Sequence, residues 1–63
     1  MDYEKYRNQK NGETEFKKDL FEEYGVSNNP KAEKCYSIAY ELGHSNGYNE
    51  IGYYFSEIVE LIK

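Results

Sequence analysis

The chain has 63 residues and a formal net charge of -4 at pH 7; 38% of its residues are hydrophobic and 32% are charged. This length leaves room for one small domain and almost no walls for a substrate pocket, which excludes most classes of enzyme. One cysteine and one histidine allow neither an internal disulfide nor, within a single chain, a four-ligand zinc site. We therefore expect a non-catalytic domain without cofactor or metal. Because the chain has neither of these features, which commonly stabilise very small proteins, we also expect a homodimer.

No uncharged stretch of the sequence is long enough to cross a bilayer. Asp2, Glu4 and Lys5 stand where a signal peptide would have an apolar run. These features predict a soluble cytoplasmic protein with no membrane partner.

Residues 1–12 are expected to form a flexible or partly helical arm ahead of a single helical domain at residues 13–63. Tyr3 and Tyr6 are three residues apart, but the polar run that follows them cannot bury itself. A helix this short is marginal in water unless it docks on something else.

The first helix is predicted over residues 13–24. Gly25 is expected to end it in a Schellman-type stop, in which Val26 packs back onto Phe21. The apolar residues of this segment fall on one helical face, which comprises Phe16, Leu20, Phe21 and Tyr24.

The second helix is predicted over residues 30–43, with Asn29 as its cap and Pro30 in its first position. Small residues on its apolar stripe permit close approach by another helix. The stripe comprises Ala32, Cys35, Tyr36, Ala39, Leu42 and Gly43.

The third helix is predicted over residues 49–62, after a turn rich in glycine and polar residues, and Ser45, Asn46 or Asn49 is expected to cap it. Its broad apolar face comprises Tyr48, Ile51, Tyr54, Phe55, Ile58, Leu61 and Ile62. The fold class predicted from the whole pattern is all-α, a small three-helix bundle.

The segment from Asn29 to Ile62 resembles short uncharacterised proteins of tailed bacteriophages. Its sequence is NPKAEKCYSIAYELGHSNGYNEIGYYFSEIVELI. The shared features are the Pro-Lys-Ala opening, the Gly-His-Ser turn followed by Gly-Tyr, and the Val-Glu-Leu-Ile ending. This resemblance covers about half of the chain. It implies a phage origin, and hence a host cytoplasm, but no activity.

Cys35 and His44 are the residues from which a nucleophile and its base could be built. Cys35 lies on the apolar stripe, however, where a free cysteine usually acts as a small hydrophobe. His44 is expected to interact with the last carbonyls of the second helix. A metal site would need Glu41 or Glu50 and a second chain. Residues 43–47 lack the glycine spacing of known phosphate-binding loops, so a turn between helices explains these glycines better.

Nucleic-acid binding is the alternative function. Basic side chains lie near Tyr3, Tyr6 and Phe16, a combination that binders of single-stranded nucleic acid use. Acidic residues interrupt the cluster and the chain is acidic overall, which disfavours a nucleic-acid partner on electrostatic grounds. The basic residues concerned are Lys5, Arg7, Lys10, Lys17 and Lys18.

The favoured function is protein binding, because the chain has eight tyrosines and several lack an expected place in the core. Tyr53 is the best candidate, since it shares a helical face with Glu57 and Glu60. The predicted binding residues are Tyr53, Glu57, Glu60, Tyr40, Tyr3 and Tyr6. With the phage resemblance, this predicts a small acidic inhibitor or modulator of a host protein, such as a defence nuclease or the transcription machinery.

Overall fold

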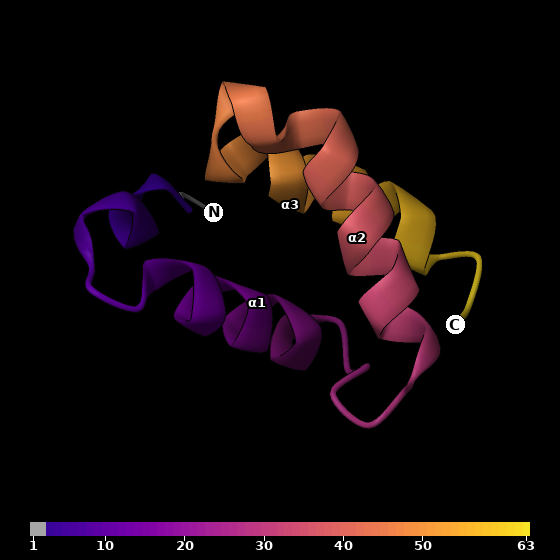
Figure 1. Ribbon diagram of the computed structural model, residues 1–63. Helices are drawn as coiled ribbons and strands as arrows, with labels where there is room; N and C mark the ends of the chain where they lie inside the picture. Colours follow the sequence, from indigo (N-terminus) through magenta and orange to yellow (C-terminus); the bar gives the residue numbers. More distant parts are fainter. Residues whose placement is uncertain (1–2) are drawn as a thin grey trace.

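The computed structural model describes residues 3–63 and contains helices and turns but no strand among them. Two short 3-10 helices accompany three α-helices (Figure 1). In chain order the elements are η1 (Glu4–Asn8), α1 (Gly12–Glu23), α2 (Lys31–Gly43), η2 (His44–Asn46) and α3 (Tyr48–Val59). The predicted three-helix bundle is confirmed, with each helix boundary within three residues of its predicted position.

Local signals determine how α1 ends and α2 begins. Gly25 has a φ of 69° and its N–H donates to the carbonyl of Glu22 at 3.2 Å, while the N–H of Val26 donates to that of Phe21 at 2.9 Å. These two bonds form the predicted Schellman motif. At the start of α2, the Asn29 side chain accepts from the N–H of Lys31 at 2.9 Å, which confirms the predicted cap.

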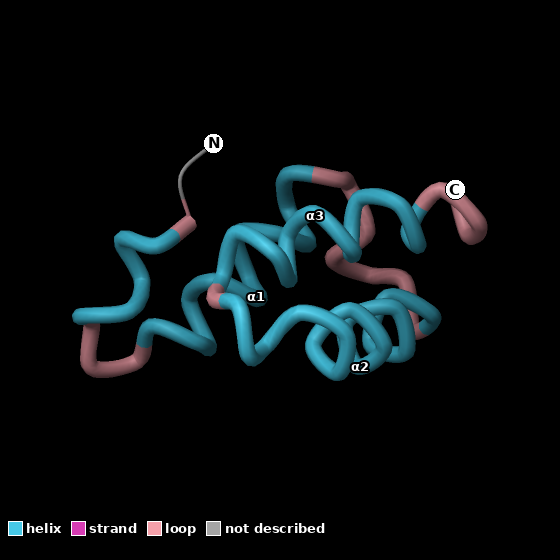
Figure 2. The backbone as a smooth tube through the Cα atoms, turned by 90° about the horizontal axis from the view of Figure 1, so that it is seen from above, coloured by secondary structure: helices cyan, strands magenta, loops and turns pink. Residues whose placement is uncertain are grey.

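Helices α2 and α3 form an antiparallel hairpin joined by η2, and α1 lies across one side of it (Figures 1 and 2). The backbones of α2 and α3 come close at Gly43, where a Cβ atom would lie 2.8 Å from the amide nitrogen of Ile51. Glycine is required here because any side chain would push the two backbones apart. In the described chain, no helix combines the length and apolar character needed to span a membrane.

The predicted arm is partly helical, since η1 forms within it, but its described part is not loose and contributes to the core. Both of its tyrosines are buried against Phe16, with ring centroids 5.3 Å away for Tyr3 and 5.7 Å for Tyr6. Their hydroxyl groups donate to acids of α1, Tyr3 to Glu23 and Tyr6 to Asp19. Tyr3 and Tyr6 were predicted to lie exposed for a partner. That was wrong, because a phenol can bury its ring while its hydroxyl reaches an acid at the edge of the core.

Two leucines predicted to face the core are exposed, Leu42 at 53% and Leu61 at 84%. The core instead includes Val59, which the predicted apolar face omitted. Gly52 and Val59 lie on the side of α3 toward α1 and η1, and the ring of Tyr3 packs directly over Gly52. Because this packing rotates the buried face of α3, and because the helix ends at Val59, Leu61 points away from the core.

The arm's hydrogen bonds predict an alkaline limit to stability. The bond to Asp19, with burial, raises the pKa of Tyr6 to about 12, and burial followed by the bond to Glu23 raises the pKa of Tyr3. Unfolded tyrosine has a pKa of about 10. The neutral phenols therefore contribute their full stability below pH 10, and this contribution declines as the pH rises through the folded values.

We expect the urea midpoint to hold steady up to about pH 10 and then to fall. Tyr6→Phe should lower the midpoint at neutral pH, because a hydrogen bond worth about 1 kcal/mol is lost, but should flatten the alkaline decline. Tyr53→Phe, at an exposed tyrosine, is the matched control, and its urea midpoint should depend on pH as that of the wild type does. An alkaline decline equally steep in Tyr6→Phe would contradict this account.

Candidate functional site

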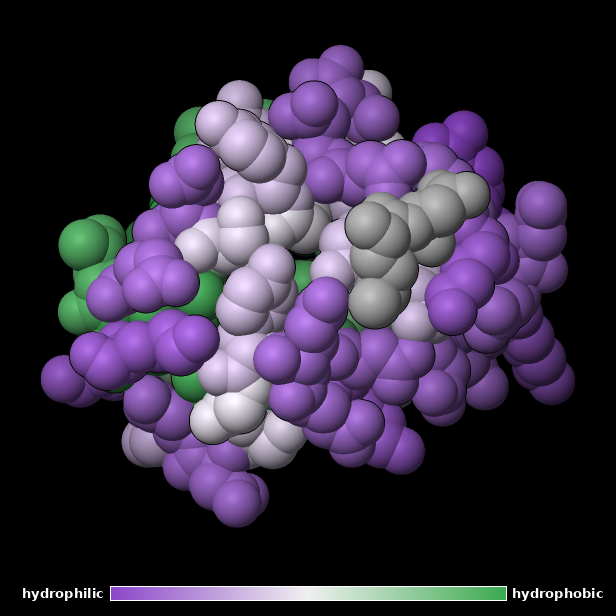
Figure 3. Space-filling view, turned by 180° about the vertical axis from the view of Figure 1, so that it is seen from behind, coloured by the Kyte–Doolittle hydropathy of each residue, from purple (hydrophilic) through white to green (hydrophobic). Residues whose placement is uncertain are grey.

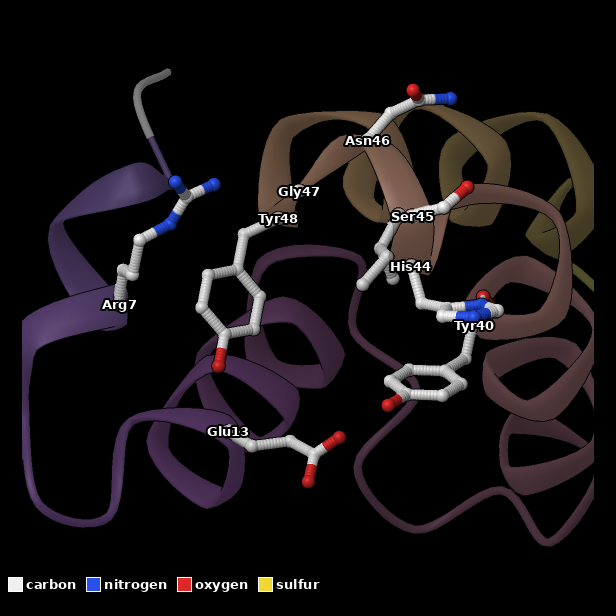
Figure 4. A pocket seen from close by; sticks show the side chains of 9 residues that line it. Arg7, Glu13, Tyr40, His44, Ser45, Asn46, Gly47 and Tyr48 are labelled. Atoms are coloured by element: carbon white, nitrogen blue, oxygen red, sulfur yellow. Dashed lines mark hydrogen bonds between the residues drawn. The ribbon is translucent and has the colours of Figure 1, made fainter.

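A cleft of about 700 Å³ lies between the start of α1 and the α2–η2–α3 connection (Figure 4). Two of its residues, Arg7 and Tyr40, were predicted binding residues, and His44 was a predicted cap. The cleft is lined by Arg7, Glu13, Tyr40, His44, Ser45, Asn46, Gly47, Tyr48 and Ile51.

One wall of the cleft is fixed by a contact between η1 and the start of α3. The N–H of Asn49 donates to the Glu4 carboxylate at 3.0 Å, and the Asn49 side chain accepts from the N–H of Tyr3 at 2.7 Å. A residue distant in sequence therefore caps α3, in place of the predicted Ser45, Asn46 or Asn49. The carboxylate fits because Gly47, with a φ of 103°, has no side chain in its way.

Oxygen-bearing side chains gather around the opening. Figure 4 shows Tyr48 and Tyr40 on opposite sides, with the Glu13 carboxylate between and below them. Burial, followed by the negative charge of Glu13, raises the pKa of the Tyr48 phenol. The Tyr48 phenol therefore remains neutral under ordinary conditions, beside the negative charge of Glu13.

A third phenol lies beside this group inside the core. Tyr36 is 8% exposed, and its hydroxyl group has no hydrogen-bond partner among the described residues. Burial, followed by the negative charge of Glu13, raises its pKa, and the Tyr40 and Tyr48 phenols add to the effect. The cluster therefore contains one buried polar group whose hydrogen-bonding capacity is unused.

His44 is held at the end of α2. Its Nδ1 lies 3.0 Å from the carbonyl oxygen of Tyr40, and the two rings stack with centroids 5.1 Å apart. The expected interaction with the last carbonyls of α2 is confirmed. Cys35 is buried, and nine residues of helix place it about 13 Å along the axis from His44, so the two do not form a nucleophile–base pair. Residues 3–63 contain no group of three acidic, cysteine or histidine residues suited to a metal ion.

The predicted strip on α3 is exposed: Tyr53 is 56% accessible, and Glu57 and Glu60 are exposed beside it. Tyr53 contacts the ring edge of Tyr54, at 5.3 Å between centroids. Tyr40 does not join this strip, since it stacks with His44 in the cleft. The remaining predicted partner-binding residues therefore belong to two separate surfaces.

Three of the five basic residues predicted for nucleic acid make contacts within the chain. Arg7 pairs with Glu4, Lys17 pairs with Glu33, and Lys5 lies 5.1 Å from the ring centroid of Tyr6. Lys17 also lies over the rings of Phe21 and Tyr36. Lys10 and Lys18 are exposed.

Sequence reasoning missed the cleft as a site, although it singled out several of its residues. Tyr48 and Tyr36 were correctly expected to pack in or against the core, and no local pattern indicated that Glu13 lies near them. Comparison with known proteins matches no curated protein and no solved structure. One family model matches residues 1–63, the whole of the sequence. The chain belongs to this family, which is described as a family of unknown function (DUF8546).

Proposed function

We propose that this protein is a non-catalytic protein-binding module. The observation that carries the proposal is the number of large apolar side chains left exposed on the α2–α3 hairpin. Large apolar side chains exposed on a small domain often mark surfaces that meet another molecule. The exposed residues are Ile38 at 50%, Tyr40 at 37%, Leu42 at 53%, Tyr53 at 56% and Leu61 at 84%.

The partner site in this proposal is the strip of Tyr53, Glu57 and Glu60 on the outer side of α3. A tyrosine flanked by two carboxylates suits a partner with an apolar slot edged by basic residues, because the ring enters the slot while the acids face the bases. The net charge of -4 favours approach to a basic surface. The resemblance of residues 29–62 to phage proteins is the ground for proposing a host protein as this partner.

The test is the affinity of Tyr53→Ala for a captured and purified partner. We expect binding to weaken by about 30-fold, the equivalent of about 2 kcal/mol, because anchoring aromatics dominate interfaces of this kind. The thermal midpoint should be unchanged, since Tyr53 is exposed. Tyr53→Phe is the matched control and should retain most of the affinity. Wild-type affinity in Tyr53→Ala would remove the strip from the interface.

Nucleic-acid binding through the arm is the alternative proposal. It would need Lys5, Arg7 and Lys10, and its affinity would fall steeply with rising salt. The arm's place in the core and the pairing of Arg7 with Glu4 favour protein binding over this alternative.

A second part of the proposal is that the chain forms a homodimer through the seam between α2 and α3 on the side away from α1. Tyr36 contacts the Phe16 and Phe21 rings of α1. At about 100° per residue, Ile38 and Leu42 lie about 160° and 120° around α2 from Tyr36. This side, which we call the seam face, comprises Ile38, Leu42, Tyr54, Ile58 and Leu61. Figure 3 shows hydrophobic residues gathered at the end of the molecule that holds α2 and the end of α3.

A second copy is the occupant that the charges of the seam face fit. Lys34 and Lys31 lie one and two turns before Ile38 on α2, whereas Glu50 and Glu57 flank Tyr54 on α3. A copy rotated by 180° about an axis parallel to the helices sets the lysines of each chain over α3 of the other. The seam face is therefore self-complementary, as a two-fold interface requires.

A further inference from the structure

We propose that the cleft between α1 and the α2–η2–α3 connection is a binding site for the guanidinium group of an arginine side chain. Three oxygen-bearing groups surround its opening, the carboxylate of Glu13 and the phenols of Tyr40 and Tyr48 (Figure 4). Arg7 also lines the cleft, but it is paired with Glu4 and lies on the far side of the Tyr48 ring. The opening thus presents hydrogen-bond acceptors and one negative charge.

A guanidinium group matches this arrangement in shape and in chemistry. It carries five N–H donors in a plane and remains charged at any ordinary pH, so one edge can pair with a carboxylate while other donors reach phenol oxygens. Its flat face also packs against aromatic rings, and the Tyr48 ring is held against Phe16 at 4.8 Å between centroids. Tyr48 itself lines the cleft, between Arg7 and Tyr40 (Figure 4).

The unpaired hydroxyl of Tyr36 is the second observation that points to a ligand. It is buried, and its ring lies 6.2 Å, between centroids, from the ring of Tyr40, which lines the cleft. A buried hydroxyl without a partner costs about 1–3 kcal/mol, and such groups concentrate at functional sites.

This site goes beyond the proposed partner strip and is independent of it. Tyr40 and His44 lie on the flank of α2 that faces α1, whereas Tyr53, Glu57 and Glu60 lie on the outer side of α3. One site can therefore fail without the other. A partner that used both would have to reach around the hairpin.

The experiment uses the full chain and three blocked amino acids as probes, followed by two-dimensional NMR. N-acetyl-arginine-N-methylamide should shift the backbone signals of residues 44–48 and those around Glu13, with millimolar affinity because the site is shallow. N-acetyl-lysine-N-methylamide should bind several-fold more weakly. N-acetyl-citrulline-N-methylamide, which has the same shape without the charge, should cause no saturable shift in these residues.

Variants then assign the contacts. Glu13→Gln should weaken arginine binding by about tenfold, because a charge-assisted hydrogen bond is lost. Tyr48→Phe should weaken it by a few-fold while leaving the fold intact. Glu22→Gln is the matched control, since it removes the same charge from the same helix outside the cleft, and it should leave binding unchanged. Citrulline binding equal to that of arginine, or an equal loss in Glu22→Gln, would overturn the proposal, and lysine binding equal to that of arginine would overturn the assignment to guanidinium.

Discussion

Replacing Phe16 by alanine is expected to leave the protein largely unfolded. Phe16 is fully buried, and its ring lies within 4.8 to 6.3 Å, between centroids, of four tyrosine rings from three other parts of the chain. Truncating a buried phenylalanine to alanine typically costs about 3–5 kcal/mol. A domain of this size rarely has more than about 3–5 kcal/mol of stability, so the loss is comparable to the whole.

The measurement is the helical signal in far-ultraviolet circular dichroism, followed through urea denaturation. Phe16→Leu is the matched control, because it keeps an apolar side chain at the same position. Apart from the loss of the ring contacts, it should lower the free energy of unfolding by less than about 1.5 kcal/mol. Phe16→Leu should therefore remain folded with a lower midpoint. A cooperative transition in Phe16→Ala at the wild-type midpoint would show that the aromatic cluster does not hold the arm and the hairpin together.

The dependence on Phe16 explains which parts of the fold could be predicted from sequence. The stop at Gly25 and the cap at Asn29 depend on a few adjacent residues, so local chemistry was sufficient for both. The docking of η1 depends on contacts between Tyr3 and Phe16 and between Glu4 and Asn49, the latter separated by 45 positions. No local pattern contains that information.

The same limit applies to the buried face of α3 and to the cleft. Periodicity showed that α3 is amphipathic, but the position of α1 decides which edge of the stripe is covered, and this placed Val59 inside and Leu61 outside. The cleft needs Glu13 from α1 beside Tyr40 and Tyr48 from the hairpin. These residues were individually visible in the sequence, whereas their juxtaposition is a property of the tertiary structure.

A substitution on the seam face is expected to separate the proposed homodimer into monomers. Wild-type protein should sediment as a dimer at high micromolar concentration. Leu42→Glu should raise the dissociation constant at least about a hundredfold, because the new carboxylate would be buried against apolar side chains of the second copy. The stability of the single chain should change little, since Leu42 is already 53% exposed within it.

Two further comparisons test the geometry of this dimer. Tyr53→Glu adds the same charge to the outer side of α3, away from the seam face, and should remain a dimer. Lys34→Glu should weaken association, because it replaces a lysine that faces α3 of the second copy with a negative charge. A wild-type monomer at high micromolar concentration, or an equal effect of Leu42→Glu and Tyr53→Glu, would contradict the proposed interface. Such a result would leave the exposed leucines available to the same partner as Tyr53, and Leu42→Glu would then weaken partner binding in place of self-association.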